Sequence, residues 1–166
     1  MPEEPFTILR AELSLFDRAE EAFALLETFL EVGQPWISRV DLDPALLELP
    51  DEMTDDRVVV QGLIDAMPAT EPKRHWWSTA SGREYDLSDE QARWDFTRLA
   101  YCSILATVWG DGTTYFEVAD QTSATYWLPD SLKAVYFDAI TAKGWQIPAH
   151  WAAAIPQYKK PRWKRF

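Results

Sequence analysis

The sequence predicts an α+β fold, with a single domain built from an antiparallel sheet and three to four packed helices. Apolar residues recur at helical spacing in residues 14–33, 88–101 and 131–143. Two segments of strand character flank Asp111-Gly112, a dipeptide typical of two-residue β-hairpin turns. A helix, then a helix with a hairpin, then a further helix is the succession expected of an α+β domain.

The first two elements are a strand from Phe6 to Leu13 and a helix from Ser14 to Gly33. Ser14 followed by Asp17 resembles a capping box, and Gly33 provides a C-terminal stop. One side of this helix is apolar (Ala19, Ala22, Phe23, Leu25, Leu26, Phe29 and Leu30). The opposite side carries Glu20, Glu27 and Glu31, so we expect an acidic face toward solvent.

The next segments are less regular. Alternation predicts a strand over Trp36–Leu42, and residues 45–49 form a short helical turn. Residues 57–67 have helical spacing, and we expect a helix there, although their β-branched run and Gly62 weaken it. Residues 68–85 are rich in Pro, Ser, Thr and Gly, which predicts a long surface loop containing a short strand.

The second half of the chain contains a helix, three strands and a further helix. A capping box at Ser88 begins a helix that runs to about Tyr101, with Phe96, Leu99 and either Ala100 or Ser103 buried. Residues 104–109 and 113–119 form the hairpin, and residues 125–128 add a short strand. Pro129 to Ser131 open the last long helix, which ends near Lys143 and Gly144 (its apolar positions are Leu132, Val135, Tyr136, Ala139 and Ile140).

The predicted domain spans residues 1–147, and residues 148–166 form a basic extension packed on it. Three prolines limit this extension to one short helix near residues 150–155. Its last eleven residues hold five Lys or Arg and no acid, and aromatic residues interleave them. We expect this tail to lie across the acidic N-terminal face, although the pattern also suits stacking on single-stranded nucleic acid.

The charge is distributed unevenly. Residues 1–72 hold seventeen of the 27 acidic residues and four of the 16 basic ones. The net charge of the whole chain is −11. Such a charge repels phosphate backbones and anionic lipid, which argues against direct nucleic-acid binding and membrane docking. It favours a basic protein partner, and it equally favours simple solubility.

Cysteine content and the chain's start predict a cytoplasmic protein. The single Cys102 lies in an apolar run, which indicates a buried, unreactive thiol and a reducing compartment. The start, Met-Pro-Glu-Glu-Pro, is acidic where a signal peptide is basic, and no apolar stretch approaches the length of a membrane span.

No motif indicates a catalytic centre, metal site or cofactor. The only histidines, His75 and His150, lie far apart and have no cysteine pair nearby, which argues against zinc. Asp41, Asp43 and the acids of residues 51–56 lack the spacing of a calcium loop. We expect no cofactor and no catalytic residue.

Two functions fit these observations. The first is an acidic binding protein, of the immunity or antitoxin type, that neutralises a basic toxin or nucleic-acid-handling protein. Its predicted partner-binding residues are Glu20, Glu27, Glu31, Asp51, Glu52, Asp55, Asp56, Trp76 and Trp77. The alternative is a small enzyme or ligand-binding domain, with His75 as acid or base in a pocket lined by aromatic residues (Trp76, Trp77, Trp109, Tyr115 and Trp127).

Overall fold

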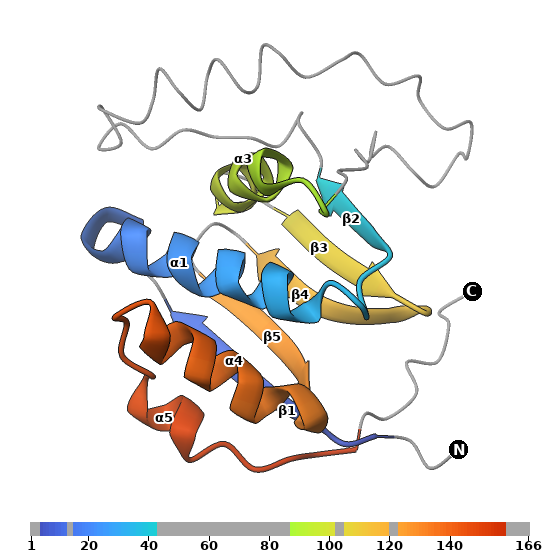
Figure 1. Ribbon diagram of the computed structural model, residues 1–166, viewed down its shortest axis with the longest axis vertical. Coiled ribbons are helices and arrows are strands. Elements are labelled where there is room, and N and C mark those ends of the chain that lie inside the picture. Colours follow the sequence, from blue (N-terminus) through green and yellow to red (C-terminus); the bar gives the residue numbers. More distant parts are fainter. Residues whose placement is uncertain (1–3, 13–14, 43–86, 102–104, 120–122, 159–166) are drawn as a thin grey trace.

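Five strands pair into one antiparallel sheet in the computed structural model, which describes residues 4–12, 15–42, 87–101, 105–119 and 123–158 (Figure 1). The strands are β1 (Phe6–Glu12), β2 (Arg39–Leu42), β3 (Leu105–Gly110), β4 (Thr113–Ala119) and β5 (Ser123–Pro129). Their order is β1-β5-β4-β3-β2, with every neighbouring pair antiparallel. The described helices are α1 (Leu15–Gly33), α3 (Glu90–Tyr101), α4 (Asp130–Ala142) and α5 (Ala149–Ala152), so the predicted α+β fold is confirmed.

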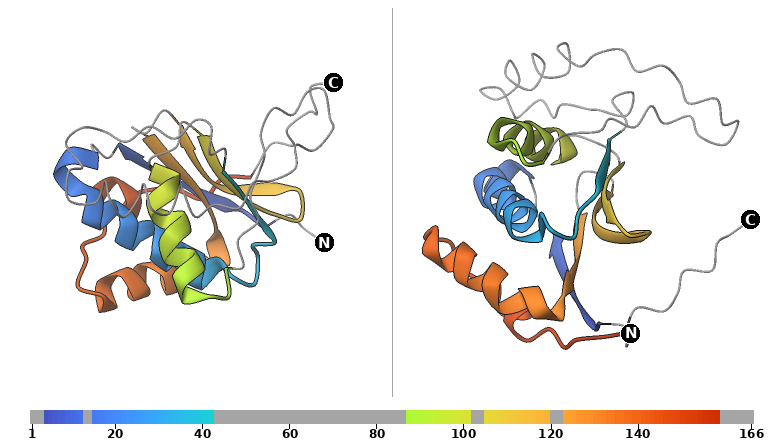
Figure 2. Two further views of the ribbon diagram at one scale, coloured as in Figure 1. Left: turned by 90° about the horizontal axis from the view of Figure 1, so that it is seen from above. Right: turned by 45° about the vertical axis from the view of Figure 1, so that its right-hand side comes forward.

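The helices lie on one face of the sheet. Figure 2 shows α1, α3 and α4 side by side over that face, and α1 packs against both of the others. We call these three helices the helix layer. Because side chains alternate along a strand, Leu9, Phe116 and Tyr126 point to the helix layer and are fully buried. The opposite face carries the intervening residues, such as Glu117 and Trp127, which are half-buried.

α1 follows the predicted helix closely. Leu26 and Leu30 on its apolar side are fully buried, and Phe29 is 2% exposed. The carbonyl of Gly33 accepts hydrogen bonds from the N–H groups of Trp36 (2.8 Å) and Ile37 (3.1 Å). These bonds hold residues 34–37 in a turn, so the strand predicted from Trp36 begins only at Arg39.

The predicted hairpin turn is confirmed between β3 and β4. Asp111 and Gly112 both have positive φ, at 49° and 74°, as a type I′ turn requires. Before the turn, the carbonyl of Trp36 occupies the space that a Cβ atom on Gly110 would need. A hydrogen bond from Ser38 N–H to the Trp109 carbonyl (2.8 Å) fixes this close approach of two backbones. Gly110 therefore allows the end of β3 to lie directly against the turn that follows α1.

The start of α4 is capped from the other end of the chain. Its N-cap residue, Pro129, provides no side-chain hydrogen bond. Instead the Pro5 carbonyl accepts a bond from Asp130 N–H (2.9 Å), and a carboxylate oxygen of Glu4 accepts one from Ser131 N–H (2.8 Å). These acceptors satisfy two of the N–H groups that a helix leaves unpaired, and the carboxylate suits the positive end of the helix dipole.

An aromatic cluster fills the space between the helix layer and the sheet. Phe29 of α1 lies 5.2 Å from Tyr126 and 5.8 Å from Tyr136, measured between ring centroids. Trp151 of α5 is fully buried and lies 5.3 Å from Tyr126. The Tyr136 hydroxyl donates to the Leu25 carbonyl at 2.9 Å, and the hydroxyls of Tyr101 and Tyr126 lie 3.1 Å apart. The polar tips of these rings thus have partners, as burial demands.

Several predicted segments lie outside the described residues. They include the turn at residues 45–49, the helix at residues 57–67, the loop at residues 68–85, Cys102 and the last eight residues of the basic tail. Within the described ranges, no helix combines the length and apolar character needed to cross a bilayer.

Candidate binding surface

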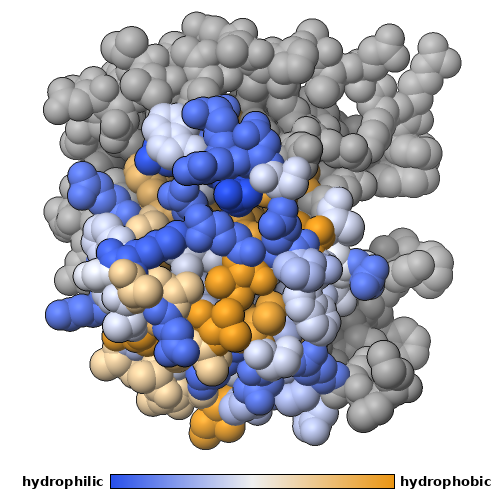
Figure 3. Space-filling view, in the orientation of Figure 1, coloured by the Kyte–Doolittle hydropathy of each residue, from blue (hydrophilic) through white to orange (hydrophobic). Residues whose placement is uncertain are grey.

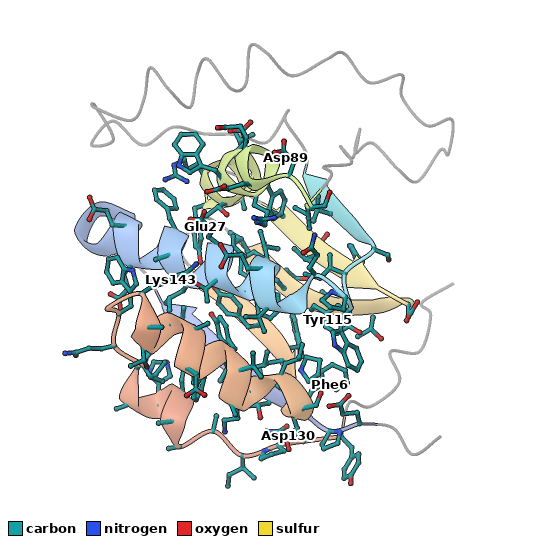
Figure 4. All side chains as sticks on the ribbon, viewed as in Figure 1. Phe6, Glu27, Asp89, Tyr115, Asp130 and Lys143 are labelled. Carbon is teal, nitrogen blue, oxygen red and sulfur yellow. The ribbon has the colours of Figure 1, made fainter. Side chains whose placement is uncertain are left out.

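The outer side of α1 carries the three helical carboxylates that the sequence predicts as a binding surface. Glu20, Glu27 and Glu31 are spaced by seven and four residues, which places them on one side of the helix. Glu20 is exposed, and Glu27 and Glu31 are half-buried. We call these three residues the acidic stripe. Figure 4 labels Glu27 on α1, beside α3, and Lys143 near the end of α4.

One carboxylate of the acidic stripe is neutralised within the chain. Lys143, which follows α4, places its Nζ 2.6 Å from a carboxylate oxygen of Glu31. An acid near the end of a helix is unfavourable to the helix dipole, and this lysine offsets that cost. No described residue forms an ion pair with Glu20 or Glu27. The stripe therefore keeps two carboxylates that the described part of the chain does not pair.

The cations of the helix layer are used differently. Arg93 donates to the carbonyls of Leu87 (2.7 Å) and Ser88 (3.1 Å), at the start of α3. The guanidinium of Arg98 lies 3.5 Å from the centroid of the Trp94 ring, a cation–π contact. The Arg98 guanidinium also lies 5.1 Å from the centroid of the Phe23 ring on α1, so both arginines make contacts within the chain.

Lys133 completes this pattern on α4. Its Nζ donates to the Ala154 carbonyl at 2.8 Å and lies 5.7 Å from the Phe137 ring. Every Lys or Arg side chain described on α3 and α4, and Lys143 beyond them, therefore has a contact within the chain. Arg93, Arg98 and Lys133 keep their charge in these contacts but are held within the chain, whereas Glu20 and Glu27 have no ion-pair partner among the described residues.

Apolar surface adjoins the acidic stripe. Val135 on α4 is 54% exposed, and Val32 on α1 and Leu132 on α4 are half-buried. Figure 3 shows hydrophobic surface between α1 and α4, bordered by hydrophilic residues. Helical spacing assigns Val135 to the apolar side of α4 together with Tyr136 and Ile140. Of these three residues, only Tyr136 and Ile140 are buried. Part of the apolar side of α4 is therefore exposed to solvent.

The other predicted binding residues are not placed. Asp51, Glu52, Asp55, Asp56, Trp76 and Trp77 lie outside the described residues, so the structure does not bring them to the acidic stripe or separate them from it.

The residues of the alternative, an aromatic-lined pocket, are placed in part. Trp109 and Trp127 are half-buried, and the Trp109 indole N–H donates to the Thr107 hydroxyl at 2.8 Å. Tyr115 is only 4% exposed and lies 6.1 Å from the Phe6 ring (Figure 4). His75 lies outside the described ranges. The pocket stays a prediction.

The titration behaviour of the described residues is most altered in the core. Burial raises the pKa of Tyr101, Tyr126 and Tyr136 above the ordinary value for tyrosine. Burial, Asp111 and Glu4 also raise the pKa of Tyr115. These phenols stay neutral and are held in hydrogen bonds or packed rings, which is a structural role.

Within the described residues, no group of three His, Cys, Asp or Glu side chains could hold a metal ion.

Comparison with known proteins found no match for this chain among family models, curated proteins or solved structures.

Proposed function

We propose that this chain is a binding protein of the immunity or antitoxin type, which acts in the cytoplasm and neutralises a basic toxin or nucleic-acid-handling protein. The contact surface is the acidic stripe of α1 together with the apolar surface between α1 and α4. The observation that carries the proposal is a difference between the cations and the carboxylates of the helix layer in how far they are engaged within the chain. The cations described on α3 and α4 contact their own chain, whereas Glu20 and Glu27 pair with no described residue.

This arrangement suits recognition of a basic protein in two steps. The net charge of −11 attracts a cationic partner from a distance, which raises the association rate at low salt. Contact then buries Val135 and its half-buried neighbours, which slows dissociation because apolar surface leaves water. A partner that itself binds nucleic acid has the required positive surface, and occupation of that surface blocks its activity.

A pair of charge reversals tests the proposal. Glu27→Lys reverses a half-buried carboxylate of the acidic stripe. Glu117→Lys makes the same change in net charge at a half-buried carboxylate that points away from the helix layer. Each purified variant and the parent chain would be immobilised and exposed to extract of the native cell, and captured proteins would be identified by mass spectrometry.

The expected result is a basic protein that the parent chain and the Glu117→Lys variant retain and that elutes as salt rises. With that protein purified, Glu27→Lys should reduce its association rate constant by about tenfold at low salt and flatten the dependence on salt. Equal association of the two variants would show that the acidic stripe serves only solubility. Capture of no basic protein by the parent chain would also count against the proposal.

A further inference from the structure

α4 has one side toward α5 and another toward α1. Lys133 is on the first side, since its Nζ donates to the Ala154 carbonyl just beyond α5. Val135 and Ala139 are one turn apart, and helical spacing places them on the opposite side, toward α1. Val135 is 54% exposed and Ala139 is half-buried, so the packing of α4 against α1 covers neither of them completely.

α1 contributes to the same apolar surface. Its Leu25 carbonyl accepts the hydrogen bond from Tyr136 of α4, and Val32 lies two turns further along that side and is half-buried. Figure 3 shows hydrophobic surface at this place, between the two helices. We call this the interhelical surface, and its residues are Val32, Leu132, Val135 and Ala139.

Carboxylates border the interhelical surface on both helices. Glu20 and Glu27 lie on the outer side of α1, where no described residue forms an ion pair with them. Asp138 on α4 is exposed, precedes Ala139 and has no ion-pair partner in the described part of the chain either. This arrangement complements an apolar strip that carries cations along both of its sides.

The backbone of this surface restricts what can cover it. α1 and α4 bond their backbone groups within each helix, so the surface offers no row of N–H and carbonyl groups to a docked chain. An extended segment that covered Val135 would bury some of its own backbone groups without partners, which is unfavourable. A helix has these groups bonded before it docks, so it can bury apolar side chains here without that penalty.

We propose that the interhelical surface binds an amphipathic helix of the basic partner. The apolar side of this helix covers Val135, and its Lys or Arg residues pair with Glu20 and Glu27 on α1 and with Asp138 on α4. The inference rests on the proposed function and specifies the form of the partner's contact segment. Such a helix has apolar residues at three- and four-residue spacing, with cations on both sides of that stripe.

Two synthetic peptides of about eighteen residues, with identical Leu, Lys and Ala content, test the helical form. In the first, Leu recurs at helical spacing with Lys on both sides, and in the second, Leu and Lys alternate as in a strand. Fluorescence anisotropy measures binding of each labelled peptide to the full chain, and circular dichroism measures its helix content when bound. The first peptide should bind about tenfold more tightly and should be helical when bound. Equal affinity, or tighter binding of the alternating peptide, overturns the inference.

A pair of apolar substitutions locates the site. Val135→Ser removes an apolar side chain of the interhelical surface and leaves the net charge unchanged. Ile155→Ser is the matched control, because Ile155 is 77% exposed and lies beyond α5. Val135→Ser should weaken binding of the first peptide about fivefold to tenfold, and Ile155→Ser should leave it unchanged. Equal weakening by the two variants would show that the peptide does not select this surface, and the inference would be lost.

A pair of charge substitutions tests the border on α4. Asp138→Asn and Asp111→Asn each remove one exposed carboxylate, but Asp111 lies in the hairpin turn between β3 and β4. Asp138→Asn should weaken the first peptide about threefold at low salt, whereas Asp111→Asn should have little effect. The same change in both variants would mean that only the net charge matters, which contradicts the proposed pairing.

Two results separate this inference from the proposed function. Suppose that the parent chain captures a basic protein, that Glu27→Lys slows its association, and that the two peptides bind equally. The helical inference is then wrong and the proposed function stands. If the parent chain captures no basic protein, the proposed function fails, and the inference fails with it.

Discussion

The inner and outer sides of the helix layer are built from opposite kinds of contact. On the inner side, the rings of Phe29 and Tyr136 pack against the ring of Tyr126, and both tyrosine hydroxyls have a hydrogen-bond partner. On the outer side, the ion pair between Glu31 and Lys143 joins two side chains that are each more than a third exposed. Inner residues should therefore determine stability, and outer residues should alter charge and binding without unfolding the chain.

The largest expected effect is at Trp151. Trp151→Ala removes a fully buried ring from the aromatic cluster and the donor to the Arg10 carbonyl, and it should reduce the free energy of unfolding by about 3–5 kcal/mol. His150→Ala is the control, because His150 contacts the same carbonyl from an exposed position and should cost less than about 1 kcal/mol. Urea denaturation measures both. Equal losses would mean that the shared hydrogen bond, and not core packing, holds α5.

A second, smaller effect concerns alkaline pH. Burial raises the pKa of Tyr101 above its ordinary value near 10, so the unfolded chain releases this proton at a lower pH than the folded chain. The folded state then binds more protons than the unfolded state. The free energy of unfolding therefore falls as the pH rises above the pKa of this phenol in the unfolded chain. Each such tyrosine should cost about 1.4 kcal/mol by pH 11.

Variants of two tyrosines isolate that contribution. Tyr101→Phe removes one buried phenol, so its free energy of unfolding should decline less between pH 8 and pH 11 than that of the parent chain. Tyr158→Phe changes a tyrosine that is 71% exposed, and it should leave the decline unchanged. Urea unfolding across this pH range provides the comparison. The same decline in all three proteins would remove the buried phenols as its cause.

Local features of the sequence were sufficient for much of the fold. The spacing of Phe23, Leu26 and Leu30 predicts α1, and Asp111-Gly112 predicts the hairpin, because both depend on residues close together in the chain. The sequence did not predict the strand order. β1 pairs with β5, more than a hundred residues away, and such pairing depends on the packing of the whole chain.

The candidate surface was predictable only in part for the same reason. Periodicity places Glu20, Glu27 and Glu31 on one side of α1, but it does not reveal that Lys143 neutralises Glu31. It also assigns Val135 to a buried face, although this residue is 54% exposed. Helical spacing reports which residues share a side of a helix, whereas exposure depends on how far neighbouring elements extend over that side.

The smallest expected effect is at the ion pair, and it separates stability from recognition most clearly. Glu31→Gln should change the free energy of unfolding by less than about 1 kcal/mol, because exposed ion pairs are screened by solvent and salt. Combined with Lys143→Met in a double-mutant cycle, it should show a coupling that disappears at high salt. Glu27→Gln, which breaks no described ion pair, should show no coupling to Lys143.

The same two variants should rank in the opposite order for binding to a basic partner. Glu31→Gln and Glu27→Gln each reduce the negative charge of the surface by one unit. Glu31→Gln also leaves Lys143 without its ion-pair partner. If Lys143 already shields Glu31, however, the partner senses Glu27 more strongly, and Glu27→Gln should slow association more. A greater slowing by Glu31→Gln would mean that the partner displaces Lys143, so that this ion pair belongs to the contact and not to the fold.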